Sequence, residues 1–353
     1  MKLLSSIVMS LIFSSTSIAG AVKVVGTVDV PIKLTNSSSK IKVNNADSKR
    51  ILLLKIELSE KAKATLTKKA VNSQISNSLL SAKSSKKIQL GMGSVPVLDQ
   101  GNFGSCVTFA NTAAVDAVIN KGDYVSQLCQ LQLGRYLEEN GYNPSGWDGS
   151  FGGIVLNQMM SFGIVNKSQQ RAVGCGGLND YPYWVTTIGR AMSPEEYHAI
   201  SEPMYSHYVD WSSIIDASQI LIDGANMDNV INATKASLQA GDRLTLGVLL
   251  PEADKGIAGA VGKYHQSNDT WVLTPEIKSA MEQETFFPGH ELVITGYDDD
   301  AVAIDEQGNE SKGLFTLRNS WGANIGDKGD FYISYDYFKA LALEVQRIRS
   351  VVL

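Results

Sequence analysis

The chain has 353 residues, of which 44% are hydrophobic, and its 31 Lys and Arg against 36 Asp and Glu give a formal net charge of −5. After residue 90 it is long enough for two small packed domains or one large domain. Scattered basic residues without interleaved aromatics disfavour nucleic-acid binding, and four histidines without ligand spacing to the three cysteines disfavour a metal site. No cofactor is implied.

The first residues have the pattern of a secretory signal peptide. One positive charge at Lys2 precedes a short apolar stretch from Leu3 to Phe13, and small residues precede Gly20. This stretch is too short to span a membrane, and no other stretch is long and apolar enough to do so. We therefore expect a signal peptide over residues 1-19 and an exported, soluble protein without stable membrane insertion.

Residues 20-90 differ in charge from the rest of the chain. They contain 14 Lys and Arg but 4 Asp and Glu, so a basic leader precedes an acidic body of residues 91-353. The predicted elements of the leader are a loop from Asn36 to Asp47, a strand from Ile51 to Leu58, a helix from Ser59 to Leu80 and an exposed basic linker from Ser81 to Lys87.

A glycine-rich turn from Gln100 to Gly104 delivers Cys106 to the start of a helix. The residues from Thr108 to Ile119 are rich in alanine and apolar nearly all round, which predicts a buried helix. The N–H groups and the dipole at a helix start stabilise an anion, so the sequence favours the Cys106 thiolate and makes this residue a candidate nucleophile. Gln100 can add an amide donor for an oxyanion. The alternative is a structural cysteine on a core helix.

The rest of the body is predicted as a helical part followed by a β-rich part, without internal repeats. The predicted helices cover Ser126 to Glu139, Gly152 to Phe162, a segment that begins at a capping box at Ser193, and Asn229 to Ala240. The predicted strands cover Arg243 to Leu250, Glu291 to Tyr297, Gly313 to Asn319 and Phe331 to Tyr335. Asp298 to Asn309 is interpreted as a solvated hairpin turn, with calcium binding as the less favoured reading. His198, His207 and His265 are interpreted as surface or structural residues.

Two motifs in the β-rich part carry the partners that a cysteine nucleophile needs. Gly289-His290 stands at the head of one predicted strand, and Asn319-Ser320-Trp321-Gly322 ends another. Attack by cysteine needs a base that takes the thiol proton, and this base needs an acceptor that fixes its ring. Asn319 can accept from His290, and Trp321 can keep water away from that bond.

In this order the motifs resemble those of the papain-like cysteine peptidases. The resemblance rests on Gln100-Gly101, Gly104-Ser105-Cys106, Gly289-His290, Gly296-Tyr297, Asn319-Ser320-Trp321-Gly322 and Gly329-Asp330-Phe331. It implies a papain-like α+β fold of two domains, with a mainly helical catalytic half that includes an insertion (residues 91-240) and a β-barrel-like half (residues 241-353). By analogy Cys106 is the nucleophile, His290 the acid and base, Asn319 the orienting residue and Gln100 the oxyanion donor.

The resemblance also implies a glycine pair and a disulfide. Gly152 and Gly153 match the glycines that line the substrate cleft in family members, and a bridge at comparable places pairs Cys129 with Cys175, which leaves Cys106 free. The sequence departs from the family pattern at Val107, where an aromatic residue is usual, and at Glu291, where a small residue is usual. The 184 residues between Cys106 and His290 also exceed the roughly 130–150 of papain-like enzymes, and insertions explain this spacing.

Together these expectations give the basic leader a hypothetical role. Residues 20-90 are interpreted as a prosegment that covers the cleft, partly through charge complementarity, and inhibits the enzyme until it is removed near Lys87 to Met92. The alternatives are a permanent accessory domain and, less favoured, a nucleic-acid-binding segment.

The predicted function is that of a monomeric, exported cysteine peptidase that is made as a zymogen. It would hydrolyse protein or peptide substrates through a thioester acyl-enzyme. Two alternatives remain open at this point: a catalytically silent binding protein with the same fold, and a transferase that resolves the acyl-enzyme with an amine.

Overall fold

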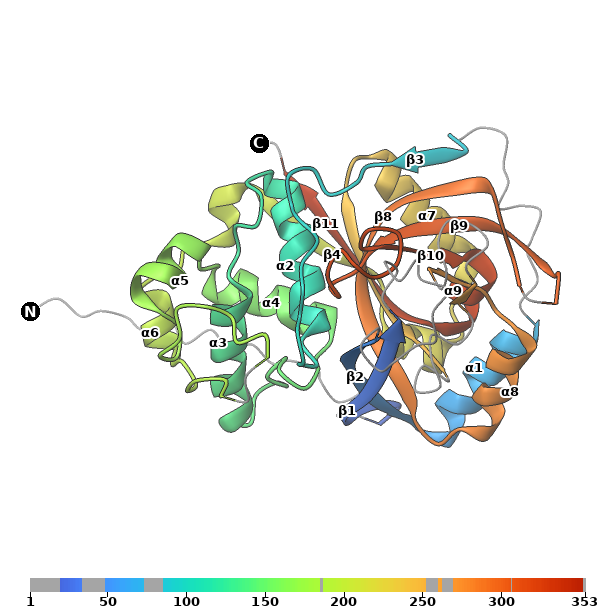
Figure 1. The fold of residues 1–353 in the computed structure, drawn as a ribbon, viewed down its shortest axis with the longest axis horizontal. Coiled ribbons are helices and arrows are strands. Elements are labelled where there is room, and N and C mark those ends of the chain that lie inside the picture. Colours follow the sequence, from blue (N-terminus) through green and yellow to red (C-terminus); the bar gives the residue numbers. More distant parts are fainter. Residues whose placement is uncertain are drawn as a thin grey trace, which may run out of the picture.

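A computed structural model describes residues 20–33, 48–72, 85–184, 187–251, 260–261, 269–305 and 307–351. This part of the chain forms a mainly helical half and a second half built around one large sheet, which lie side by side (Figure 1). The α+β class predicted from the sequence is therefore confirmed. The predicted signal peptide, the predicted loop from Asn36 to Asp47 and His265 lie outside the described residues.

The helical half is built from short helices with capping residues at their starts. The Ser126 side chain accepts the Cys129 N–H at the start of α3, and Ser193 forms a capping box with Glu196 at the start of α6. The bounds of α4 are those predicted from the sequence. The elements of this half are α2 (Cys106–Ile119), α3 (Gln127–Glu139), α4 (Gly152–Phe162), α5 (Lys167–Val173), α6 (Pro194–His198) and the 3-10 helix η3 (Met204–His207).

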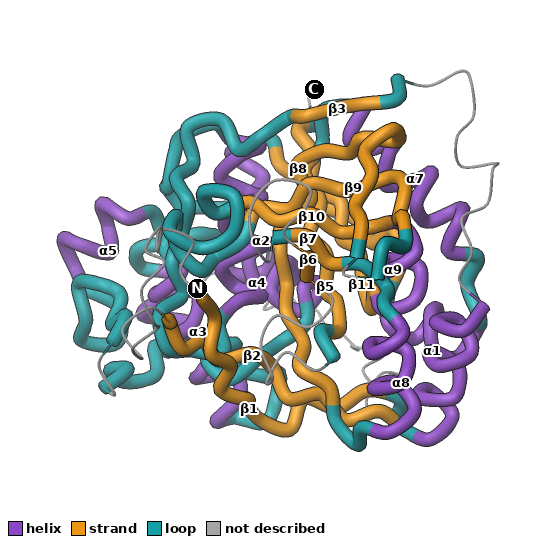
Figure 2. The backbone as a smooth tube through the Cα atoms, turned by 45° about the vertical axis from the view of Figure 1, so that its right-hand side comes forward, coloured by secondary structure: helices purple, strands orange, loops and turns teal. Residues whose placement is uncertain are grey.

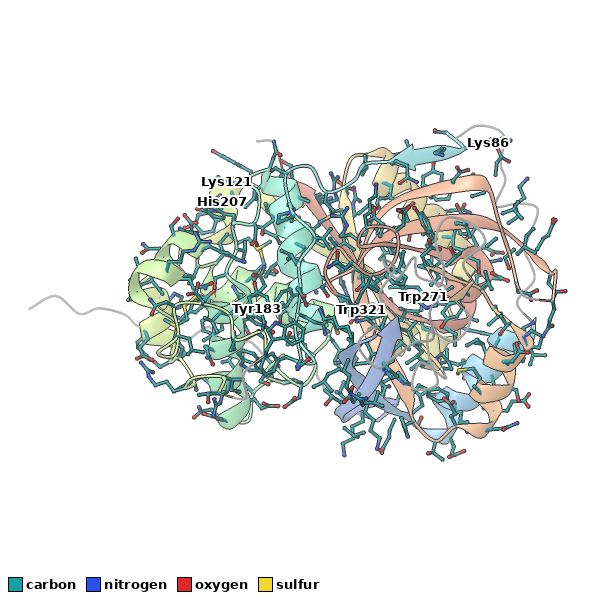
Figure 3. The ribbon with its side chains drawn as sticks, in the orientation of Figure 1. Lys86, Lys121, Tyr183, His207, Trp271 and Trp321 are labelled. Carbon is teal, nitrogen blue, oxygen red and sulfur yellow. A yellow bond between two sulfur atoms is a disulfide. The ribbon has the colours of Figure 1, made fainter. Side chains whose placement is uncertain are left out.

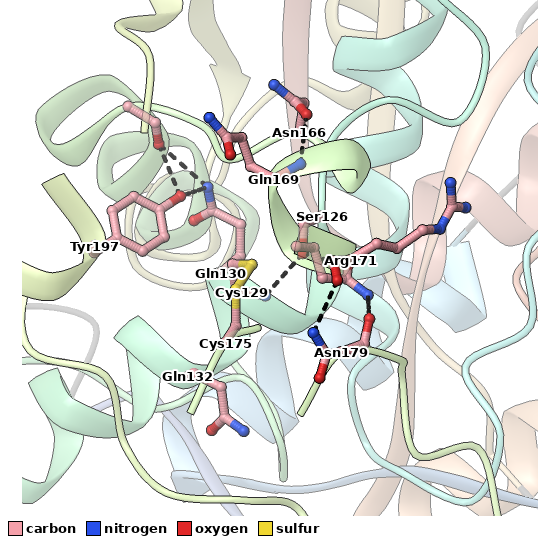
Figure 4. The surroundings of a disulfide bond; sticks show 12 residues. Ser126, Cys129, Gln130, Gln132, Asn166, Gln169, Arg171, Cys175, Asn179 and Tyr197 are labelled. Atoms are coloured by element: carbon pink, nitrogen blue, oxygen red, sulfur yellow. Dashed lines mark hydrogen bonds between the residues drawn. A yellow bond between two sulfur atoms is a disulfide. The ribbon is translucent and has the colours of Figure 1, made fainter. Parts of the chain in front are cut away.

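A disulfide joins Cys129 to Cys175 in the core of the helical half (Figure 4), as the resemblance implies. Both cysteines are fully buried, in one apolar cluster with Leu131, Trp147 and Tyr197. The bridge ties α3 to a glycine-rich loop that has no helix or strand of its own. Cys106 is left as the free cysteine.

Removal of this disulfide is expected to lower the free energy of unfolding. The bridge closes a loop across 46 residues, for which the chain-entropy model gives about 4 kcal/mol. Urea unfolding of a variant with both Cys129→Ser and Cys175→Ser should show a clearly lower midpoint than the parent chain. Cys106→Ser is the matched control, since that cysteine forms no disulfide; equal midpoints for the double variant and the parent would contradict the prediction.

The second half is built around one sheet with the strand order β4-β11-β5-β8-β9-β10-β7-β6 in the described chain. Every residue of β5 after Arg243 is buried, as expected for a strand with neighbours on both edges and cover on its faces. The strands are β4 (Val209–Ile215), β5 (Arg243–Leu249), β6 (Ala260–Val261), β7 (Thr270–Trp271), β8 (Phe287–Ile304), β9 (Glu310–Arg318), β10 (Asp330–Ser334) and β11 (Ala342–Ser350); the helices are the π-helix η4 (Gln219–Asp223), α7 (Met227–Gln239), α8 (Pro275–Gln283) and α9 (Tyr335–Leu341).

The boundary between the halves lies earlier than residue 240. Strand β4 pairs with β11, with Ile215 opposite Val345, and α7 packs against the sheet on the β-rich side (Figures 1 and 2). Residues from Val209 onwards therefore belong to the sheet half. The part of this half that precedes residue 241 consists of β4, η4 and α7.

The solvated hairpin turn predicted from Asp298 to Asn309 is present between β8 and β9 but is shorter than predicted, because Asp298 to Ile304 still belong to β8. Asp299 is buried and accepts from the Lys235 ammonium at 2.6 Å and from the Tyr335 hydroxyl at 2.6 Å. The buried cation compensates the charge that the sequence had placed in solvent. The turn follows at Asp305, whose carbonyl accepts the Gly308 N–H. No group of three or more potential metal ligands is present among the described residues.

The N-terminal segment is attached to the sheet half at two places. Strands β1 (Val22–Lys33) and β2 (Ser48–Leu58) form an antiparallel hairpin, and β2 continues onto β8, with Leu54 opposite Gly289. Helix α1 (Glu60–Asn72) then packs on α8 and α9 through the buried side chains of Ala62, Leu66 and Ala70 (Figure 2). The predicted helix is confirmed up to Asn72, and its last predicted turns lie outside the described residues.

Residues 85–89 belong to the sheet of the body. Strand β3 (Lys87–Gln89) pairs with β8, and the Gln89 amide donates to the Thr316 hydroxyl at 2.8 Å. Lys86 and Lys87 form ion pairs with Asp300 and Asp298 at 3.2 and 2.9 Å. The expected attraction between basic leader and acidic body is thus present at the linker and also at Lys49 of β2, which pairs with Asp99, while strand pairing and apolar packing hold the rest of the hairpin and α1. In the described part of the chain, no helix combines the length and the apolar character that crossing a membrane requires.

Candidate active site

Cys106 is the first residue of α2 and lies in the interface between the helical half and the sheet half. Its predecessor Ser105 is the N-cap but makes no side-chain capping bond; its hydroxyl pairs with the Tyr181 hydroxyl at 2.9 Å instead. Tyr181 donates to the Gln100 carbonyl at 2.9 Å, so one tyrosine ties the turn before the cysteine to the cysteine's own helix. The Cys106 side chain is fully buried.

Burial opposes the thiolate that the position of Cys106 at the start of a helix favours. Burial raises the pKa of the Cys106 thiol to about 12, and the charge of Glu291 raises it further, while backbone N–H groups of Glu291, Val107 and Cys106 lower it. The helix start therefore acts in the predicted direction, but the cost of desolvating the anion is larger. The sequence could not show this, since the cover over the sulfur comes from distant segments.

His290 and Asn319 are brought together by neighbouring strands of the sheet. His290 Nε2 and Asn319 Oδ1 are 2.8 Å apart, and Asn319 Oδ1 also accepts the Ser320 N–H. The Trp321 ring stacks on the imidazole with centroids 4.6 Å apart, and Trp271 packs behind Trp321 (Figure 3). With Nε2 engaged by the carboxamide, Nδ1 is the ring atom left to exchange a proton, and it has no partner.

Burial also keeps His290 neutral. It lowers the pKa of the imidazole to about 4, and the bond to Asn319 raises the pKa by a smaller amount. The neighbouring cysteine is a thiol at the same pH, so the described state contains no thiolate–imidazolium pair. Admission of water to both side chains would bring the two pKa values towards each other.

Helix α2, which begins at Cys106, packs against strand β8, which carries His290. The backbone N–H of Glu291, which follows His290, reaches the Cys106 sulfur. Strand β8 therefore supplies both the imidazole and a donor to the thiol. Cys106, His290 and Asn319 are all nearly or fully buried.

Gln100 lies in the same interface with its amide fully engaged. Its Oε1 accepts the Ser320 hydroxyl at 2.8 Å, next to Asn319, and its Nε2 donates to the Phe103 carbonyl at 2.8 Å. The remaining donor of Nε2 points to the Leu52 carbonyl of β2 at 3.3 Å. The Gln100 amide, which the sequence predicts to hold an oxyanion, thus lies beside Asn319. Its second N–H is directed at a carbonyl of the N-terminal hairpin.

The hairpin lies against two loops of the helical half, one of which directly precedes the cysteine. Side chains of Thr27 and Leu54 lie so close to Gly104 and Gly149 that a Cβ there would come within 2.6 and 2.8 Å of them. Leu54 also contacts the backbone position of Gly289, the residue before His290. The Lys49 ammonium of β2 also binds the body of the chain, at Asp99 over 2.5 Å and at the Trp321 carbonyl over 3.1 Å.

Comparisons with known proteins give matches to cysteine proteases. No protein-family model matches the sequence. The chain is 24% identical over 238 residues to "Cysteine proteinase 1" of Entamoeba histolytica, a match that covers 66% of this chain and 58% of that protein. The resemblance to cysteine proteases is confirmed. The chain spans little more than half the length of this curated relative.

Solved structures of cysteine proteases also match the chain. Xylellain, a cysteine protease from Xylella fastidiosa, has a TM-score of 0.49 and 20% identity, with 79% of this chain and 91% of that chain covered. The proform of the Amb a 11 cysteine protease, a ragweed pollen allergen, has a TM-score of 0.45 and 16% identity, with 83% and 76% covered.

The glycine pair that the resemblance assigns to the substrate cleft lies at the start of α4. Gly152 and Gly153 form the first turn of α4, where Gly152 donates its N–H to Glu344 of β11 and packs against Glu291. Gly149, three residues earlier, lies against Val24 and Leu54 of the N-terminal hairpin. Sequence reasoning missed this glycine, which has a φ of 122° and is the last residue of a Gly-Trp-Asp-Gly run that could have indicated a turn.

Proposed function

We propose that this chain is an exported cysteine peptidase with Cys106 as nucleophile, His290 as acid and base, Asn319 as orienting residue and Gln100 as oxyanion donor. The observation that carries the proposal is the His290–Asn319 contact of 2.8 Å under the Trp321 ring. It lies in the same interface as a free cysteine at the start of a helix. A cysteine kept for structure alone would need neither the imidazole nor the carboxamide.

The reaction would begin with transfer of the thiol proton from Cys106 to Nδ1 of His290. The sulfur then attacks the scissile carbonyl, and the Cys106 N–H and the Gln100 amide hold the negative oxygen of the tetrahedral intermediate. His290 returns the proton to the leaving amine as the C–N bond breaks, which leaves a thioester. Water, deprotonated by His290, attacks the thioester; the proton returns to the sulfur and the acid leaves.

The N-terminal segment acts, in this proposal, as an inhibitory prosegment. The Leu52 carbonyl accepts from Gln100 at 3.3 Å, and β2 occupies the edge of β8 at Gly289, beside His290. A substrate would need the same donor and the same strand edge. The burial that this cover helps to produce also keeps both the thiol and the imidazole neutral.

The cut that releases the prosegment would lie upstream of the range from Lys87 to Met92 expected from the sequence. Strand β3 is paired with β8, and the Ser85 carbonyl accepts from the Tyr297 hydroxyl at 2.5 Å. A cut after Lys87 would divide a strand that is part of the body's sheet. Cleavage before Ser85 leaves that strand whole.

Export is part of the proposal. It is supported by the apolar stretch from Leu3 to Phe13 and by the buried disulfide, which persists in an oxidising compartment. The expected monomer and the peptide substrate belong to the same proposal.

The activated chain is expected to react once, at Cys106, with a thiol-directed epoxide inhibitor, because only a cysteine with an acid to protonate the opened epoxide reacts quickly. Peptide mapping by mass spectrometry would locate the adduct. A chain that folds and takes up no inhibitor after activation would be the silent binding protein of the first alternative. Product masses with and without an added amine separate hydrolysis from acyl transfer.

A further inference from the structure

A buried asparagine of α2 connects the cysteine's helix to the sheet half. Helix α2 runs along the border between the two halves (Figure 1) and packs against β8 and β5. Its residues are mostly apolar, and Asn111, a little more than one turn after Cys106, is fully buried among them. A buried amide costs free energy unless its donors and its acceptor are bonded. The partners of Asn111 therefore indicate what this polar side chain contributes.

Both polar atoms of the Asn111 side chain have partners. Nδ2 donates to Glu291 Oε1 at 2.7 Å and to the Val107 carbonyl at 2.8 Å, and Oδ1 accepts the Thr245 hydroxyl at 3.1 Å. A carboxamide has two N–H donors and one acceptor oxygen, so both donors and the acceptor are in use. Glu291 and Thr245 are buried as well. A buried polar network whose members are bonded in this way holds its parts rigidly in one arrangement.

The partners of Asn111 lie next to the two residues that must react together. Val107 follows Cys106 in the first turn of α2, and Glu291 follows His290 on β8. Thr245 lies on the neighbouring strand β5, where it is two residues from the partner of Glu291 in the β5–β8 pairing. Asn111 thus binds the first turn of its own helix and two adjacent strands at once. Contacts to two strands fix both the height and the rotation of α2 on the sheet.

Apolar packing alone would hold α2 less exactly. A small cavity of about 10 Å³ lies between the helix and the sheet, lined among others by Phe109, Ala110 and Ala113 of α2 and by Val293 of β8. The hydrophobic effect is non-directional, so contacts of this kind tolerate a small shift of the helix. Hydrogen bonds weaken steeply when their angle or length changes. The bonds of Asn111 therefore specify the position of α2 where the apolar contacts leave it free to move.

We propose that Asn111 is a positioning residue that keeps the Cys106 sulfur in register with His290 by tying the first turn of α2 to β8 and β5. This inference rests on the proposed peptidase function and adds a residue to that same site. Asn111 acts through Val107 and Glu291, the chain neighbours of the two reacting residues. The backbone N–H of Glu291 also reaches the Cys106 sulfur, so a shift of β8 relative to α2 changes the surroundings of the sulfur as well as the place of the imidazole.

Asn111→Leu tests this inference, because leucine is similar in size and makes none of the three hydrogen bonds. With the activated full chain, we expect kcat per folded molecule to fall by about 100-fold, as for a misplacement of reacting groups by about 1 Å, and KM to stay within about threefold. Urea unfolding gives the folded fraction. A kcat within threefold of the parent would overturn the positioning role and leave the peptidase proposal standing. No peptide hydrolysis by the parent would overturn the peptidase proposal itself.

Thr112→Val is the matched control for a loss of buried hydrogen bonds. Thr112 is the next residue of α2 and is fully buried, but its hydroxyl accepts from Gln127 of α3, within the helical half. This variant should lose stability and keep kcat within about threefold of the parent. Equal losses of kcat in Thr112→Val and Asn111→Leu would show that kcat follows general damage to the core, and would overturn the proposal.

A double variant keeps the test open if Asn111→Leu does not fold. Asn111→Asp replaces the donor with an acceptor that faces Glu291, so kcat should fall here too. When Glu291→Gln is added, an amide donor again faces a carboxylate, and kcat should be at least about tenfold higher than in Asn111→Asp alone. A double variant no more active than Asn111→Asp would show that the bond to Glu291 does not position the site.

Discussion

Cys106→Ala is expected to abolish peptide hydrolysis while the chain stays folded. In the proposed mechanism the sulfur forms the bond to the substrate, and no other group among the described residues of the site can replace it: Asn319 and Gln100 are amides, and His290 is held by Asn319. Loss of a covalent nucleophile lowers kcat/KM by about 100,000-fold or more. The measurement is hydrolysis of an unselected peptide library by the activated variant.

Stability separates this effect from unfolding. The side chain of Cys106 is fully buried, and loss of one sulfur atom leaves a small cavity that costs on the order of 1 kcal/mol. The urea midpoint should therefore move little. Cys106→Ser keeps a side chain of similar size and serves as a second variant, which should also be inactive because a serine hydroxyl in this setting is a much poorer nucleophile. Hydrolysis within tenfold of the parent in either variant would rule out Cys106 as the nucleophile.

Local signals in the sequence predicted the elements that carry the site. The glycine-rich turn before Cys106 and the apolar run after it gave α2, the serine before Gln127 gave the start of α3, and the pattern from Gly152 gave the bounds of α4. Each of these depends on residues within one helix. The spatial meeting of His290 with Asn319 was expected only from motif order, because no local pattern specifies which strands become neighbours.

Features that depend on distant segments were missed or predicted wrongly. Strand β1 has no counterpart among the predicted elements, and nothing in the leader indicated that β2 would join the edge of β8. Asp299 was placed in a solvated turn because its partner Lys235 lies 64 residues away. Burial of the Cys106 thiol likewise comes from other segments, and its effect on the pKa is larger than that of the helix start.

Displacement of the hairpin is expected to activate Cys106 in the uncut chain. Leu54 is buried against Gly149 and Gly289, so Leu54→Asp would place a charge in an apolar contact and favour departure of β2 from β8. Water then reaches the thiol, and its pKa falls from about 12 towards the ordinary 9.0. Each pKa unit is a tenfold change in thiolate at pH 7, so the rate of labelling by a thiol-directed epoxide should rise by up to about 1000-fold.

The pH profile shows whether this change has the proposed cause. In the parent, the labelling rate should rise with pH throughout the neutral range because the thiol stays protonated up to a pKa of about 12. In Leu54→Asp the profile should level off at lower pH, and peptide hydrolysis should appear without cleavage of the chain. Hydrolysis is the decisive readout, since an unfolded chain also exposes its thiol but cannot turn over a substrate. Glu57→Gln, at an exposed position of the same strand, is the matched control and should behave as the parent; equal rates in Leu54→Asp and the parent would mean that the hairpin is not what keeps the cysteine protonated.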